Sequence, residues 1–141
     1  MSDAAAMEAC LLAVAEAGTD IRHALFDRFL AAYPARRPVF LNLDAASRRM
    51  TDETLQMLFG LARGEGWVWL QIAELVGNHR NYGALSLAEY DDFIEWTVEE
   101  LARAAGPAWS AEAAAAWERQ AAELKLLVRR AQAEWASALS A

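Results

Sequence analysis

The pattern of apolar and polar residues along the chain is that of amphipathic helices. Apolar residues recur at spacings of three and four through most of the sequence, and no stretch alternates at the two-residue spacing of a strand between hairpin turns. Alanine, leucine and glutamate dominate, and β-branched residues are sparse. The pattern therefore predicts an all-α fold of six to seven helices.

Residues that begin or end helices divide the first part of the chain. The segment 3–17 is predicted to form a helix that Gly18 ends, and Thr19-Asp20 is predicted to cap a second helix. Pro34 suits the first turn of a short third helix, because its missing N–H would have no partner there. That helix is expected to be short, since Pro38 disfavours the helical conformation at the residue before it.

The middle of the chain is predicted to contain a loop and two helices. A polar connection, NLDAASRR at 42–49, follows Phe40 and leads to a helix expected near 51–63. The apolar residues of this helix share one face: Leu55, Leu58, Phe59 and Ala62. Gly64 and Gly66 then separate it from a helix predicted over about 67–79.

Two long helices are predicted to complete the fold. Ser86 and Glu89 have the spacing of a capping box, in which each side chain bonds the backbone N–H of the other residue. The helix that begins there is expected to end at Gly106-Pro107, and Ser110 is a predicted cap for the last helix. Because a short loop joins these two helices, we expect them to pack as an antiparallel pair.

Composition and charge exclude several classes of function. The 141 residues have the length of a single domain, residues 1–141, and the net charge of −7 with a pI near 4.8 argues against nucleic-acid binding. Cys10 is the only cysteine, which excludes an internal disulfide and a thiolate-type zinc site. No apolar run reaches the roughly 18 residues of a membrane span, and the acidic N-terminus is unlike a secretory signal. We therefore expect a cytoplasmic protein.

One histidine lies where chemistry is possible. His79 is on the same face of its helix as the apolar residues Val68, Ile72, Leu75 and Val76. The Leu75 carbonyl, one turn earlier, could accept a hydrogen bond from Nδ1 only after the ring turns, which would leave Nε2 for a metal, and Tyr90 is an alternative partner. The alternative is a structural histidine at a helix end, satisfied by backbone carbonyls. His23, the only other histidine, is expected on the exposed side of its helix.

Three stretches, taken in order, resemble the globin family, specifically the single-domain bacterial haemoglobins and the haem domains of flavohaemoglobins. They are LFDRFLAAYPARRPVF at 25–40, GNHRNYG at 77–83 and AAAWERQAAEL at 114–124. The first is similar to the family's second and third helices, the second to the segment around the iron-binding histidine, and the third to the start of the last helix. The resemblance covers most of the chain and implies a globin fold that binds haem b (iron protoporphyrin IX).

The resemblance also implies which residues face the iron-binding side of the haem. His79 takes the place of the proximal histidine, which is the metal ligand, and Leu75 lies one turn before it. Tyr90 and Glu134 match the tyrosine and glutamate that form hydrogen bonds with the proximal histidine in flavohaemoglobins. The alternatives are a core tyrosine and a solvated helix glutamate.

On the opposite, distal side the resemblance implies a mostly apolar lining. Phe40 takes the place of the phenylalanine that stacks on the haem, and Phe26 occupies a distal position where bacterial members often have tyrosine. Met50 falls where the distal histidine or glutamine usually lies, with Thr54 one turn later. Because the preceding connection varies in length in the family, Thr51 or Leu55 are alternatives to these two positions.

The implied function is binding of a diatomic gas (O₂, NO or CO) for transport, scavenging or sensing. An apolar distal side lacks a general acid or base, so peroxidase or NO dioxygenase activity is expected to be weak at most. Such activity would also need an external reductase, because the chain has no room for a flavin or nicotinamide domain. The alternative function is a haem-free globin-fold module for protein interaction or hydrophobic-ligand sensing.

Overall fold

The computed structural model describes residues 1–83 and 85–140, and within these residues the chain forms helices and turns with no β-strand. The all-α fold predicted from the sequence is confirmed. Six α-helices and three short 3₁₀ helices occur in this part of the chain: α1 (Asp3–Ala17), α2 (Arg22–Ala32), η1 (Pro34–Val39), α3 (Leu43–Ala62), α4 (Trp67–His79), η2 (Arg80–Tyr82), α5 (Leu87–Ala105), η3 (Gly106–Ala108) and α6 (Ala111–Ser140).

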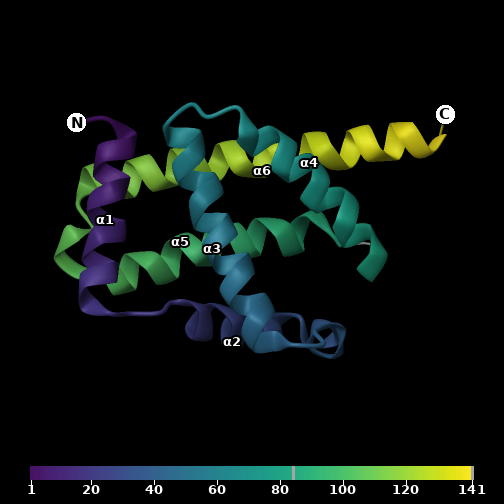
Figure 1. Ribbon diagram of the computed structural model, residues 1–141, viewed down its shortest axis with the longest axis horizontal. Helices are drawn as coiled ribbons and strands as arrows, with labels where there is room; N and C mark the ends of the chain where they lie inside the picture. The colour runs from purple at the N-terminus through teal and green to yellow at the C-terminus, as the bar shows by residue number, and fades with distance from the viewer. Residues whose placement is uncertain (84, 141) are drawn as a thin grey trace.

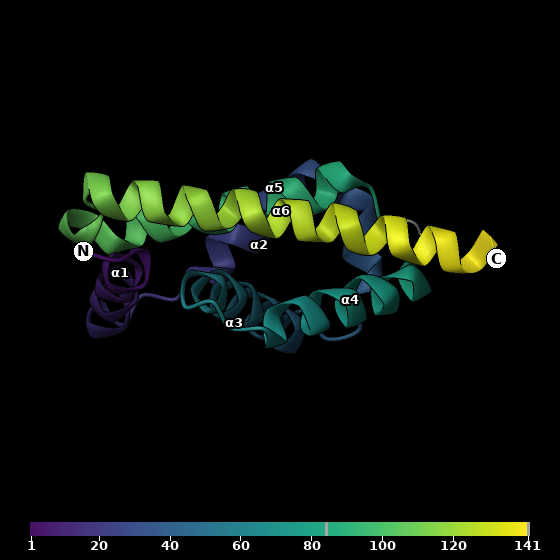
Figure 2. The ribbon, with the colours of Figure 1, turned by 90° about the horizontal axis from the view of Figure 1, so that it is seen from above.

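The most extensive contacts between helices are those that α6 makes with α5 and α4. Helices α5 and α6 lie side by side and run in opposite directions, as the sequence predicted (Figures 1 and 2). Helix α4 lies along the C-terminal half of α6, and α1 packs against its N-terminal half. Helix α3 crosses α5 at a steep angle on the side where α4 lies (Figure 1). None of the described helices combines the length and apolar content needed to cross a membrane.

Local capping explains why several helices begin and end where they do. The Ser2 hydroxyl accepts a hydrogen bond from the backbone N–H of Ala5, and Gly18 ends α1 with a φ of 66°, a left-handed conformation that favours glycine. At the start of α5, the Ser86 hydroxyl accepts from the Glu89 N–H and the Glu89 carboxylate accepts from the Ser86 N–H. The predicted capping box is therefore confirmed.

The start of α3 differs from the prediction. The stretch 42–49, predicted as a polar connection, is helical from Leu43, and the Asn42 side chain caps it by accepting from the Ala45 N–H at 3.0 Å. The physical reason is a polar anchor from α2. The buried Arg22 guanidinium donates to the Asp44 carbonyl at 2.7 Å and pairs with the Asp44 carboxylate at 2.9 Å.

The buried apolar residues form two clusters. The larger cluster lies between α6 and the helices around it, with Trp117, Leu101, Leu124 and Ile72 among its fully buried members. The smaller, aromatic cluster joins α2 to the first half of α5 and consists of Leu25, Phe26, Phe29, Leu30 and Phe93.

Candidate functional site

His79 ends α4, and its imidazole is held by the backbone of its own helix. The side chain is half-buried, and Nδ1 lies 2.7 Å from the carbonyl oxygen of Leu75, one turn earlier. A carbonyl only accepts hydrogen bonds, so this contact places the proton of the neutral ring on Nδ1. The Nε2 atom then keeps its lone pair, which is the form in which a histidine binds a metal.

Two tyrosine rings flank the imidazole. The ring centroids of Tyr90 and Tyr82 lie 6.0 and 6.3 Å from that of His79, both in edge-to-face arrangements. Burial raises the pKa of the Tyr90 phenol to about 12, with a smaller contribution from the negative charge of Glu89. The Tyr90 phenol therefore remains neutral at physiological pH, with its ring beside that of His79.

Glu134 does not join this group. It lies on the exposed side of α6, where its carboxylate accepts from Arg130 Nε at 3.2 Å, one helical turn away. The helix phase explains this position, since Ala131 and Trp135 are the residues of that turn that face α4. The alternative of a solvated helix glutamate describes Glu134 as the structure places it.

The residues expected on the distal side gather in the aromatic cluster. Phe26 is buried and meets Phe40 edge to face, with the two ring centroids 5.9 Å apart. Phe26 meets Phe93 in the same manner at 5.5 Å, and Met50 packs against the edge of the cluster. The structure thus brings Phe26, Phe40 and Met50 together in the smaller cluster, whereas Leu75 and Tyr90 pack against the larger one.

Two buried threonines on α3 differ in how their hydroxyl groups are used. The Thr54 hydroxyl donates to the Met50 carbonyl at 2.8 Å, so its proton is committed to the helix backbone. The Thr51 hydroxyl is equally buried but has no hydrogen-bond partner within the described part of the chain. Buried hydroxyl groups without a partner are uncommon in proteins. Leu55, the other alternative, packs against the larger cluster.

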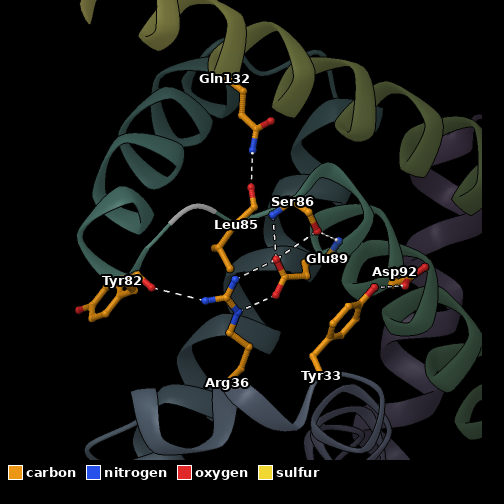
Figure 3. Close-up of polar contacts among 8 residues, drawn as sticks. All are labelled: Tyr33, Arg36, Tyr82, Leu85, Ser86, Glu89, Asp92 and Gln132. Atoms are coloured by element: carbon orange, nitrogen blue, oxygen red, sulfur yellow. Dashed lines mark hydrogen bonds and ion pairs between the residues drawn. The ribbon is translucent and has the colours of Figure 1, made fainter.

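A nearly buried ion pair holds the loop that follows His79 (Figure 3). Arg36 of η1 donates from Nε and Nη2 to the two carboxylate oxygens of Glu89, at 2.6 and 3.0 Å. Arg36 Nη1 also lies 3.5 Å from the Tyr82 carbonyl, and Gln132 of α6 donates to the Leu85 carbonyl at 3.2 Å. Tyr82 is therefore linked to η1, and Leu85 to α6.

The charge of Glu89 depends on this pairing. The hydrogen bonds from Arg36 hold the pKa of the Glu89 carboxyl below its usual value, against the opposing effect of burial. The sequence identified Glu89 only as a helix cap, and Arg36 was not recognised as its partner. Next to this pair, the Tyr33 hydroxyl donates to Asp92 at 2.5 Å and joins η1 to α5 a second time (Figure 3).

The open hollows described on the surface lie elsewhere. One is lined by residues from the starts of α1 and α6, including Asp3 and Arg119, and another lies between Leu11 of α1 and Phe59 of α3. Neither hollow includes His79. In the described residues, no three His, Cys, Asp or Glu side chains are grouped so as to bind a metal ion.

Comparison with known proteins does not extend these observations. The sequence matches no protein-family model, and no curated protein is significantly similar to it.

Proposed function

We propose that this protein is a haem-binding globin in which His79 binds the iron and the opposite face of the iron is available to a diatomic gas. The observation that carries the proposal is the 2.7 Å contact between His79 Nδ1 and the Leu75 carbonyl, because it leaves Nε2 as the free ligand atom. A neutral imidazole is a common axial ligand of haem iron, so this donor suits haem b.

The residues that would hold haem b come from both clusters. On the iron-binding side these are His79, Leu75 and Tyr90, and on the distal side Phe26, Phe40, Met50 and Thr54. Haem b would supply an iron that can bind O₂, NO or CO. The surrounding apolar side chains would exclude water from the macrocycle, and the loop fixed by Arg36 and Glu89 would keep the end of α4 in place.

Reversible binding fits the available side chains better than catalysis. Thr54 has already committed its hydroxyl proton to the Met50 carbonyl, so it does not supply a gas ligand with the charge-assisted hydrogen bond of about 1.5–3 kcal/mol that a distal donor can give. Phe26, Phe40 and Met50 have no group that transfers protons. We therefore propose gas transport, scavenging or sensing, with an external reductase needed for any peroxidase-like or NO-detoxifying turnover.

The histidine substitutions test this proposal. Titrated with haemin, the wild-type protein should develop a Soret band that saturates at one haem per chain. His79→Ala should lose this band or shift it strongly, because the iron loses its axial nitrogen. The exposed His23 provides a matched control, and His23→Ala should behave as the wild type does. Identical titrations of the two variants would remove the assignment of His79.

A second candidate is a haem-free module that binds a partner or a hydrophobic ligand. The observation in its favour is that Phe26 and Phe40 already pack edge to face against each other. These two side chains are therefore in contact with apolar partners without a cofactor. Haem that stays with the protein in equal amount throughout purification would count against this candidate.

A further inference from the structure

Trp135, near the end of α6, makes three contacts with the last part of α4 and the residue that follows it. Its indole Nε1 donates to the Ala73 carbonyl at 2.9 Å. The indole atoms Cζ2, Cε2 and Nε1 lie closest to Gly77, and the guanidinium of Arg80 lies over the indole at 5.0 Å. Positions 73, 77 and 80 lie on one face of a helix, so a single side chain of α6 covers that whole face.

Gly77 makes this close approach possible. A Cβ atom at position 77 would lie 2.6 Å from Cζ2 of Trp135 and 2.9 Å from Cε2, closer than real carbon atoms approach. Glycine inside a helix is otherwise unfavourable, because it gives the unfolded chain more freedom than alanine does. The contact with Trp135 explains why α4 has a glycine two residues before His79.

The contacts of Trp135 lie on either side of the histidine and of its acceptor. Leu75, whose carbonyl binds Nδ1, is between Ala73 and Gly77, and His79 is between Gly77 and Arg80. An element fixed at these three points cannot easily twist or unwind between them. The positions of the imidazole and of its acceptor are therefore both set by the indole.

We propose that Trp135 is a positioning residue for His79, which holds the final turns of α4 so that Nδ1 stays on the Leu75 carbonyl and Nε2 stays free for iron. The inference rests on the proposed haem-binding function and gives it a determinant in α6. Glu134, one residue earlier, is on the wrong side of α6 to support His79. Trp135 has this role instead.

The positioning can be measured without haem. The ¹⁵N chemical shifts of the His79 ring in the haem-free protein report which nitrogen carries the proton. In the wild type we expect a proton fixed on Nδ1, and in Trp135→Ala a mixture of the two tautomers. Trp135→Phe keeps an aromatic ring over Gly77 but lacks the N–H, so it should give a smaller change and still fold. Trp67→Ala is the control, because Trp67 lies at the start of α4, away from His79, and is about as exposed as Trp135, at 39% against 37%.

Haem affinity then tests the link to the proposed function. Trp135→Ala and Gly77→Ala should each weaken haemin binding by about 10- to 100-fold, which is typical of losing a residue that supports a metal ligand. The two effects should not add, since Gly77→Ala has no indole to clash with once Trp135 is removed. Trp67→Ala should leave the affinity unchanged.

The outcomes separate this inference from the proposed function. If the wild type binds haemin but Trp135→Ala changes neither its affinity nor the His79 ring shifts, the positioning role is wrong and haem binding stands. If the wild type does not bind haemin, the proposed function fails, and the ring shifts alone decide whether Trp135 positions His79. Additive effects of Gly77→Ala and Trp135→Ala on the affinity would also contradict the inference.

Discussion

Replacing Trp117 by alanine should lower the free energy of unfolding by about 3–5 kcal/mol, the range measured for removing a large aromatic side chain from a core. Trp117 is fully buried in the first third of α6 and stacks on Trp109, with the ring centroids 6.5 Å apart. Because α1 packs against the N-terminal half of α6, a cavity at this position weakens the contact between these two helices. Urea denaturation followed by circular dichroism measures the change.

An exposed leucine on α4 provides the control for this experiment. Leu70 is 70% exposed, so Leu70→Ala should change the stability by no more than about 0.5 kcal/mol. A loss of under about 1 kcal/mol for Trp117→Ala would be below the range for such cavities and would contradict the buried position given to Trp117.

Arg36→Met should destabilise the protein by about 3 kcal/mol at pH 7, because it leaves the Glu89 carboxylate without its partner in a nearly buried position. The side chain of Glu89 is only 9% exposed and that of Arg36 22% exposed. A surface pair gives the comparison. Arg119 is 60% exposed in its pair with Asp3, so Arg119→Met should lower the stability far less than Arg36→Met does.

The effect of Arg36→Met should depend on pH in a defined direction. Arg36 lowers the pKa of Glu89 in the folded state, so the pairing contributes stability above the unfolded value of about 4.3. This contribution is lost as the pH falls through the lower folded-state pKa. The difference in the free energy of unfolding between the wild type and Arg36→Met should therefore become smaller as the pH is lowered from 7 to 3. An equal difference at both ends of the range would contradict the assignment of the effect to Glu89.

Helix boundaries set by local chemistry could be predicted from the sequence. The Ser86 and Glu89 side chains bond only the backbone of their own turn, and Gly18 ends α1 by its own conformation. Such signals do not depend on the rest of the fold. The start of α3 depends on Arg22, a residue 20 positions before Asn42 that reaches Asp44 from another helix. No periodic apolar pattern marks such a polar anchor, so the helix was predicted to begin too late.

The contacts of the candidate site also divide into local ones and ones between residues far apart in the sequence. The bond between His79 and Leu75 lies within one helical turn, and the sequence therefore predicted it. The pair of Arg36 with Glu89 joins residues 53 positions apart, and the contact of Trp135 with Ala73 joins residues 62 apart. These depend on how helices are placed relative to one another. Gly77 was the one available signal, since a glycine within a helix indicates a close approach by another group.

The most direct test of haem ligation by His79 is the resonance Raman spectrum of the reduced, haem-reconstituted His23→Ala protein, in which His79 is the only histidine left. We predict an iron–imidazole stretching band that shifts when the protein is labelled with ¹⁵N-histidine. A reconstituted protein whose spectrum has no band sensitive to this label would contradict the proposal that His79 binds the iron.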